Sequence, residues 1–417
     1  MNKLMLAFAR IVLVGVIMLG MVSSASAKGK GDGAYQTGFV RWRAADGGFG
    51  GWTLDGVQRT NNTLQLDAAT AKAGTDPYPA GGYNGGNYYN GGSFVVGEAL
   101  SPVVSTTRFN FTEAIASWNA STPPGTWLEV QFTAQYGSRW SKWYVLGIWA
   151  SDTSTVQRHS VQSQGDTDGY VAVDTFVSTN KKETANAFQL KIRLFSEDGI
   201  ATPTVRNASL AYSTSAPKSA SVSPGTPALW NHLLSVPQCS QMVYPDGGEV
   251  WCSPTSTAMV LGYWNTDPGS SCADREIPAV EGVYDWIYDG HGNWPFNTAY
   301  AATKSVGAQP LEGYVARFTS LAKAEEFINA GVPVIMSIAW NKGDLTGSSV
   351  ASTNGHLLVL VGFDAQGNPI VNDPAFPNDG QVQATYLRSE FEPLWLQASG
   401  GTVYLIYPEG WSVPPLQ

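Results

Sequence analysis

Cys252 is the residue of this sequence best suited to act as a nucleophile. It directly precedes an apolar run at 253–264 that has the pattern of a helix, and Pro254 stands in the first turn, where a missing amide hydrogen costs nothing. The positive end of a helix favours the thiolate, which is the reactive form of cysteine. We therefore expect a reactive thiol at the start of this helix.

A thiolate nucleophile needs a partner that takes up and returns a proton, and histidine does this most often. The chain has four histidines, at positions 159, 232, 291 and 356. His356 opens the apolar run 355–363, and Asp373 follows it by seventeen residues, across the turn signal at 364–367. Two paired strands would bring Asp373 beside His356, where a carboxylate fixes the imidazole tautomer.

The third requirement is a pair of donors for the oxyanion that forms during acyl transfer. The backbone N–H of Cys252 supplies one donor. A side-chain amide supplies the other, and Gln241 is our first choice, with Gln238 as the alternative.

The residues flanking these groups suggest a substrate-binding wall. Trp251 and Ser253 adjoin the nucleophile, while His291 and Trp294 lie in the polar loop 288–297. We expect these four to contact substrate, with His291 acting as a loop residue near the cleft and not as a catalytic base. The chain has no HExxH, paired CxxC or EF-hand spacing, so we expect no metal or other cofactor.

Residues 1–27 have the features of a secretory signal: basic residues, an apolar stretch at 11–22 and the small-residue site Ala25-Ser26-Ala27. We expect cleavage after Ala27 and a secreted or periplasmic protein without a membrane span. Export makes a disulfide expected among the three cysteines. We expect the pair Cys239–Cys272, which would leave Cys252 free, over two free thiols at these positions. The competing pair Cys239–Cys252 would block activity until it was reduced.

The composition of the chain indicates what kind of fold to expect. Only 14% of the 417 residues are charged, while Gly (45), Trp (15), Tyr (18) and Phe (16) are plentiful, which favours short strands and many turns. After a mobile tail at 28–35, we expect a β-sandwich at 36–212, jelly-roll-like in its connections. Its aromatic residues could hold a glycan or another cell-surface ligand, at the edge formed by Trp140 and Trp143 or at the Tyr-bearing loop 81–92.

The composition of the Ser/Pro/Ala-rich segment 213–228 predicts a linker. The pattern of apolar residues changes after this segment. In 229–417 we expect helices first and strands later, an α+β arrangement. The helices are expected at 253–264 and 321–330, and the strands at 332–340, 355–363, 368–372 and 402–407. The net charge of −9 disfavours nucleic acid as a partner, because phosphates would be repelled.

The segments VPQCSQ, WCSPTSTAMVLGYW, GVPVIMSIAW, NGHLLVLVGF and VNDP resemble the C39-like branch of the papain-like cysteine peptidases. The resemblance covers about 229–408 and implies a papain-like α+β fold, with the cysteine helix packed on an antiparallel sheet. It implies Cys252 as nucleophile, His356 as base, Asp373 as orienting residue and Gln241 as oxyanion donor. The usual Cys-Gly-Pro is Cys252-Ser253-Pro254 here, and the first half resembles an N-terminal module found with some secreted C39-like proteins.

These observations predict an exported cysteine peptidase that hydrolyses a peptide or protein substrate. Two alternatives use the same residues differently. In the first, the sandwich binds a glycan or protein at a cell surface and the second half is a vestigial scaffold. In the second, the acyl group passes to an amine instead of water.

Overall fold

The computed structural model describes residues 34–180 and 182–416. The expected signal segment 1–27 lies outside the described residues, as does most of the expected tail 28–35. Tyr35, at the end of that tail, donates a hydrogen bond from its hydroxyl to the carbonyl of Gly400. Within the described ranges, no helix has the length and hydropathy that a membrane crossing requires.

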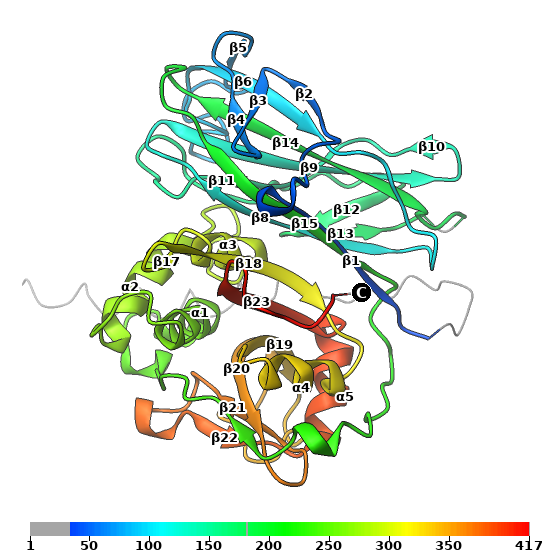
Figure 1. The fold of residues 1–417 in the computed structure, drawn as a ribbon, viewed down its shortest axis with the longest axis vertical. Helices are drawn as coiled ribbons and strands as arrows, with labels where there is room; N and C mark the ends of the chain where they lie inside the picture. The colour runs from blue at the N-terminus through cyan, green and yellow to red at the C-terminus, as the bar shows by residue number, and fades with distance from the viewer. Residues whose placement is uncertain (1–33, 181, 417) are drawn as a thin grey trace, which may run out of the picture. The chain divides into compact units, whose positions relative to one another are not determined.

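The first half is an all-β sandwich of two antiparallel sheets (Figure 1). The first sheet has the order β12-β13-β8-β15-β4-β3, with β1 also paired to β15. Its strands are β1 (Thr37–Arg43), β3 (Val57–Thr60), β4 (Thr63–Leu66), β8 (Glu113–Ser121), β12 (Gly169–Ala172), β13 (Thr175–Ser178) and β15 (Thr204–Ser213).

The second sheet has the order β10-β9-β14-β6-β2, with β11 on β9, β5 on β6 and β7 on β14. Its strands are β2 (Thr53–Asp55), β5 (Lys72–Thr75), β6 (Ser93–Leu100), β7 (Val104–Ser105), β9 (Thr126–Tyr136), β10 (Arg139–Trp140), β11 (Tyr144–Trp149) and β14 (Ala187–Ser196). Alternation along β14 sends Leu190, Ile192 and Leu194 into the core between the sheets and leaves Lys191 and Arg193 on the outer face.

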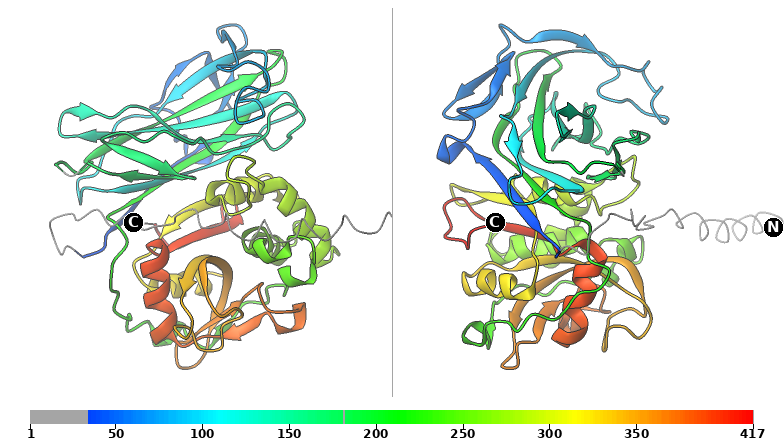
Figure 2. Two further views of the ribbon diagram at one scale, coloured as in Figure 1. Left: turned by 180° about the vertical axis from the view of Figure 1, so that it is seen from behind. Right: turned by 90° about the vertical axis from the view of Figure 1, so that its right-hand side faces the viewer.

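The second half combines five helices with an antiparallel sheet of order β17-β18-β23-β19-β20-β21-β22, and β16 pairs with β20. The helices are α1 (Cys252–Tyr263), α2 (Cys272–Val283), α3 (Trp294–Ala301), α4 (Leu321–Asn329) and α5 (Arg388–Ser399). The strands are β16 (His232–Leu233), β17 (Ser305–Val306), β18 (Gln309–Arg317), β19 (Val334–Trp340), β20 (Thr353–Phe363), β21 (Pro369–Asn372), β22 (Gln383–Thr385) and β23 (Thr402–Pro408). Figure 2 shows the helices against this sheet from two further sides.

The expected order of helices before strands is wrong in detail, because α4 and α5 interleave with the strands. Residues 170–177 have the apolar pattern of one strand, but they belong to two strands, β12 and β13, joined by a tight turn. Val173 occupies that turn with φ of 59°, and the Asp174 N–H donates to the Ala172 carbonyl. This three-residue turn is rare and strained, especially at a β-branched residue.

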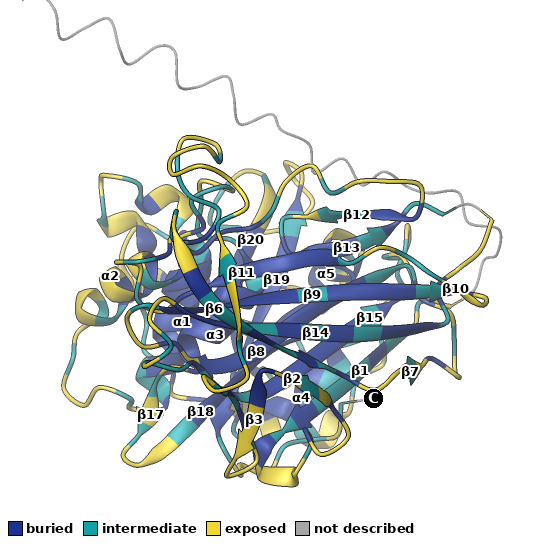
Figure 3. Ribbon diagram, turned by 90° about the horizontal axis from the view of Figure 1, so that it is seen from above, coloured by how far each residue is buried: buried dark blue, intermediate teal, exposed yellow. Residues whose placement is uncertain are grey.

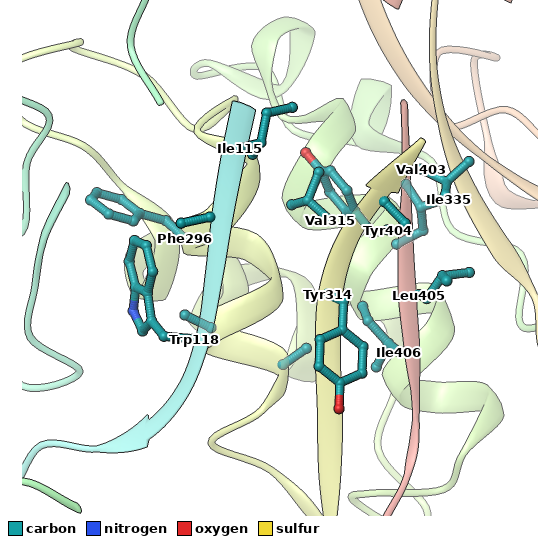
Figure 4. Close-up of a cluster of buried hydrophobic side chains, with 14 of the residues drawn as sticks. Ile115, Trp118, Phe296, Tyr314, Val315, Ile335, Val403, Tyr404, Leu405 and Ile406 are labelled. Atoms are coloured by element: carbon teal, nitrogen blue, oxygen red, sulfur yellow. The ribbon is translucent and has the colours of Figure 1, made fainter. Parts of the chain in front are cut away.

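The sandwich packs on the second half along β8, β15 and β18. The side chain of Asn119 bridges to both backbone groups of Gly313, at 2.7 and 3.2 Å, and Ser117 Oγ accepts from the Val315 N–H at 2.8 Å. Trp118 meets Phe296 across the same boundary, with ring centroids 6.2 Å apart (Figure 4). Buried residues of both halves therefore form one continuous core. Figure 3, seen from above, shows β9 and β14 of the sandwich as mostly buried strands with exposed loops around them.

The segment expected as a linker begins with Ser213, the last residue of β15, and then forms no helix or strand before the short 3-10 helix Pro227–Leu229. Its backbone is fastened to the second half. The Ser223 N–H donates to Glu392 at 2.9 Å, and the Thr226 N–H donates to Glu325 at 2.7 Å.

Candidate active site

The free thiol of Cys252 lies at the first residue of α1. The helix is held deep in the second half, and Ser256, one turn along, donates to the Leu357 carbonyl on β20 at 3.2 Å. That bond fixes the start of α1 next to the strand that carries His356. The thiol therefore combines partial exposure with the positive end of a helix dipole.

The other two cysteines form the expected disulfide, Cys239–Cys272. It joins the segment before Gln241 to the first residue of α2. The alternative pair Cys239–Cys252 is thereby excluded in this structure. Cys239 and Cys272 also lie near Glu276, but sulfurs bonded to each other are not available as metal ligands.

His356 and Asp373 lie side by side and buried. His356 is the partner of Ile338 in the β19–β20 ladder, and Asp373 directly follows β21, which pairs with β20. The distance from His356 Nε2 to Asp373 Oδ1 is 2.7 Å. This bond leaves Nδ1 as the imidazole nitrogen that can serve Cys252.

The carboxylate of Asp373 is fully enclosed by donors. The hydroxyls of Ser349 and Tyr386 each donate to Oδ2 at 2.8 Å, and the Ala375 N–H donates to Oδ1 at 3.0 Å. A buried carboxylate with this set of donors stays ionised and does not move. Ser349 and Tyr386 were not anticipated from the sequence, because nothing in their local pattern marks them.

The electrostatics of this pair favour a charged imidazole. Burial alone would lower the pKa of His356, but the charge and hydrogen bond of Asp373, together with Cys252, raise it to about 10. Burial also opposes ionisation of Asp373, yet the neighbouring His356 and the donors around it hold the pKa of this carboxyl below its usual range. The imidazole is therefore protonated at neutral pH.

Trp340 covers the imidazole edge-on, with ring centroids 5.6 Å apart and planes at 88°. An irregularity in the β19–β20 register between Ile338 and Trp340 re-aims this end of β19. The indole N–H donates to the Val350 carbonyl at 3.0 Å, which fixes the ring. Trp340 thus shields the His356–Asp373 bond from water. The sequence did not predict this role, because Trp340 lies at the end of an apolar strand pattern.

Gln241 begins the 3-10 helix Gln241–Val243 and is 2% exposed. Its N–H donates to the Pro374 carbonyl at 3.0 Å, and its own carbonyl accepts from the Tyr244 N–H at 3.3 Å. Its side-chain Oε1 is buried without a hydrogen-bond partner among the described residues. Gln241 is therefore tied to the loop after Asp373 and to the segment that leads into Cys252, while Gln238 is half-buried three residues earlier.

The residues expected to contact substrate differ in burial and orientation. Ser253 is 1% exposed, and its hydroxyl is hydrogen-bonded to that of Tyr404 at 2.9 Å, so it packs inward. The rings of Trp251 and His291 lie 6.2 Å apart, which brings His291 close to the residue that precedes Cys252. Burial lowers the pKa of His291 to about 4, so this imidazole is neutral and acts as no proton donor at pH 7.

The sandwich also reaches this region, through Asp174 in the β12–β13 turn. Its Oδ2 accepts from the Trp294 N–H, at the start of α3, at 2.6 Å. Burial raises the pKa of Asp174 to about 7. The two residues are 120 positions apart in the sequence, and no local pattern predicts their contact.

The sandwich also holds the loop between α2 and α3, which carries His291. Both carboxylate oxygens of Asp285 accept from the Ser160 N–H, and Oδ2 accepts from Asn293 at 2.9 Å. The position of the loop that carries His291 therefore depends on the first half of the chain.

Two solved structures show a distant likeness to this chain. One belongs to a study of "the carbohydrate-binding modules from the beta-sandwich super family", with 12% identity, a TM-score of 0.18, and coverage of 40% of this chain and 58% of that one. A second contains "the CBM32-1, CBM32-2, and M60 catalytic domains from Clostridium perfringens ZmpB", with 8% identity, a TM-score of 0.13, and coverage of 91% and 33%. This chain thus spans less than two thirds of either. No curated protein matches it.

Family models are more informative. Residues 38–213 match the model described as the peptidase C39 N-terminal domain. Residues 233–403 match the Peptidase_C39-like family and include Gln241, Cys252, His356 and Asp373. The chain therefore consists of a peptidase C39 N-terminal domain followed by a domain of the peptidase C39-like family.

Proposed function

We propose that this protein is a cysteine peptidase with a papain-like catalytic arrangement. The observation that carries the proposal is the buried His356–Asp373 pair, 2.7 Å apart, in a site that also holds a free thiol at the start of α1. The raised pKa of His356 supports an imidazolium that pairs with the Cys252 thiolate at neutral pH. Membership of the peptidase C39-like family supports the same reading.

In the first step, the Cys252 thiolate attacks the peptide carbonyl carbon and forms a C–S bond. The oxyanion accepts hydrogen bonds from the Cys252 N–H and the Gln241 amide. The peptide C–N bond then breaks as His356 transfers its Nδ1 proton to the leaving amine. Asp373 keeps the imidazole oriented throughout.

In the second step, the now neutral His356 removes a proton from water, and the resulting hydroxide attacks the thioester. The C–S bond breaks, the carboxylic acid leaves, and the thiolate–imidazolium pair is restored. Trp251, His291 and Trp294 would line the peptide site. Ser253 acts there only indirectly, through its bond to Tyr404.

We further propose that the protein is exported. The signal-like residues 1–27 motivate this, and the Cys239–Cys272 disulfide supports it, because such bonds persist in oxidising compartments. Residues 36–212 and 229–417 would be the two folded modules of the mature protein.

Replacing Cys252 by Ala tests the peptidase proposal. We expect a peptide-library digest with the wild-type chain to yield new amino termini, and the C252A digest to yield none. Iodoacetamide should alkylate one thiol in the wild type and none in C252A, because the other two cysteines are paired. Hydrolysis that persists in C252A would refute the proposal.

Two other outcomes separate the alternatives. Joined peptides in the presence of an added amine, with little free acid, would identify an acyltransferase. A wild-type thiol that reacts with iodoacetamide no faster than free cysteine, with no cleavage of any peptide, would identify a vestigial site.

A further inference from the structure

A groove of about 680 Å³ lies on the sandwich, away from the cysteine site. Its floor is the outer face of the second sheet, formed by β5, β6, β9 and β14, and its rim is the loop 77–89. None of the residues that line it belongs to the peptidase C39-like domain. Its volume is that of a site for a small or oligomeric organic ligand.

The rim is built from tyrosines in fixed positions. Tyr78 is 43% exposed, and its ring lies 5.1 Å from that of Tyr83 and 5.8 Å from that of Tyr88. Tyr88 in turn stands edge-on to Tyr89, at 4.7 Å. These rings offer a wall that is apolar in its faces and polar at its hydroxyls.

The Gly-rich segment that carries these rings is ordered by hydrogen bonds to one side chain. Asp76 Oδ2 accepts from the N–H groups of Tyr89 and Gly91, at 2.7 and 2.9 Å. The Gly81 N–H donates to Asn87 Oδ1 at 2.8 Å, which closes the tip of the loop. The rings are therefore positioned before a ligand arrives, which lowers the entropy cost of binding.

The floor is polar, but its charges are already neutralised by one another. Arg193 binds Glu98 at 3.0 Å and Glu129 at 2.9 Å, and Lys191 lies 3.7 Å from Glu98. Lys72 pairs with Asp55, so three cations face three carboxylates. Glu129, 1% exposed, also accepts from Tyr89 Oη at 2.5 Å and from Gln131 at 2.6 Å. A charged ligand would have to break one of these pairs, and a purely apolar ligand would strip water from polar groups without replacing their hydrogen bonds.

The remaining class is a neutral ligand that carries both hydroxyls and flat apolar faces. We propose that this groove binds a neutral oligosaccharide, with the ring of Tyr78 stacked on the apolar face of one sugar unit. Sugar hydroxyls would bond to the outer atoms of Glu98, Lys72 and Gln131. The proposal does not rest on the peptidase activity, because the groove and the cysteine site share no residue.

The test measures binding of the full chain to neutral tetrasaccharides of glucose, xylose, mannose and N-acetylglucosamine by titration calorimetry. Tetragalacturonate serves as the charged comparison. We expect at least one neutral tetrasaccharide to bind with a Kd below 1 mM and tetragalacturonate to bind at least 10-fold more weakly. No binding of any neutral tetrasaccharide at 5 mM, or equal binding of the charged one, would overturn the proposal.

Substitutions then locate the site. We expect Tyr78→Ala to weaken binding at least 10-fold and Tyr78→Phe to keep it within threefold, because the ring face is retained. Ile200→Ala is the matched control: this exposed apolar side chain, 86% accessible, lies on the same module and outside the groove. Equal affinities for Tyr78→Ala and Ile200→Ala would refute the groove as the binding site. A cleavage defect in C252A has no bearing on this result, so the two proposals fail separately.

Discussion

At the residue scale, the proposed chemistry depends most on the imidazole of His356. Asp373 holds one nitrogen, Trp340 covers the ring, and β20 fixes the backbone. Each of these contacts acts on the orientation or the charge of one side chain. A change in any of them should appear first in the pH dependence of activity.

Asp373→Asn tests the charge contribution directly. The amide retains the shape of the side chain but removes the negative charge that raises the pKa of His356 to about 10. We expect the imidazole pKa to fall toward its ordinary value of about 6.5, so the alkaline limb of the kcat/KM profile should move toward neutral pH. At pH 9 we expect roughly 100-fold less activity, a loss typical of impaired acid–base catalysis.

Asp344→Asn is the control for this substitution, since Asp344 lies exposed in the loop after β19 and bonds only to Asn341. Its profile should match that of the wild type. An alkaline limb in D373N that stays where the wild type has it would show that Asp373 does not set the imidazole charge.

At the scale of elements, the β12–β13 turn is the feature with the clearest energetic signature. Asp174 titrates near pH 3.9 in an unfolded chain, whereas burial raises its folded pKa to about 7. Between these values the folded state binds more protons than the unfolded state, so this group makes stability fall as pH rises from about 4 to 7. Val173, in the same turn, has a strained φ, so the turn keeps this geometry although the backbone strain destabilises the folded state.

Asp174→Asn should remove that dependence, because the amide oxygen can still accept from the Trp294 N–H without a buried charge. We expect D174N to be more stable than the wild type at pH 8, by on the order of 1–4 kcal/mol, and no more stable at pH 4. Urea unfolding at both values measures this. The same difference in unfolding free energy between the wild type and D174N at both pH values would contradict this prediction.

Asp174→Ala is the companion variant, since it removes both the charge and the acceptor for the start of α3. It should be less stable than D174N at every pH by about 1 kcal/mol, the usual net contribution of one hydrogen bond. We also expect a higher KM for peptides, because the segment that contains His291 and Trp294 loses one of its contacts with the sandwich.

Local patterns predicted the elements that are strongly periodic or bounded by turn residues. The hairpin of β20 and β21 was predicted from its apolar runs and the turn at 364–367, and with it the approach of Asp373 to His356. Helix α5 was missed because Pro393 interrupts it and its apolar residues follow no clear face. The turn at Val173 was missed because both flanking strands share one apolar pattern, and only the tertiary contact to α3 makes the break necessary.

At the scale of the whole molecule, the two halves share one continuous core. Asn119 satisfies both backbone groups of Gly313, and all of these atoms are buried. Gly313 itself lies so close to α3 that a side chain there would meet the Thr298 carbonyl at 2.3 Å. We expect the described residues to unfold as one cooperative unit and not as two independent modules.

Asn119→Ala tests this expectation. The substitution leaves a buried N–H and a buried carbonyl of Gly313 without partners, a cost of about 1–3 kcal/mol for each buried group left unpaired. We expect one urea transition, shifted equally whether it is followed by tryptophan fluorescence or by far-UV circular dichroism. Asn110→Ala, which removes only an exposed bond to Thr184, should leave the midpoint in place. Two separate transitions in the wild type would refute the single unit.

The bonds between Ser117 and Val315, Asn119 and Gly313, and Asp174 and Trp294 have a consequence for how such chains can diverge. The sandwich cannot simply be replaced by an unrelated domain, or joined to one, because the new neighbour would not place its backbone groups opposite these side chains. Substitutions at 117, 119 and 174 cannot be compensated by a change of residue type at 315, 313 or 294, because the groups bonded there belong to the backbone. We therefore expect relatives to keep a hydrogen-bonding side chain at 117, 119 and 174, even where the two surfaces away from this boundary vary independently.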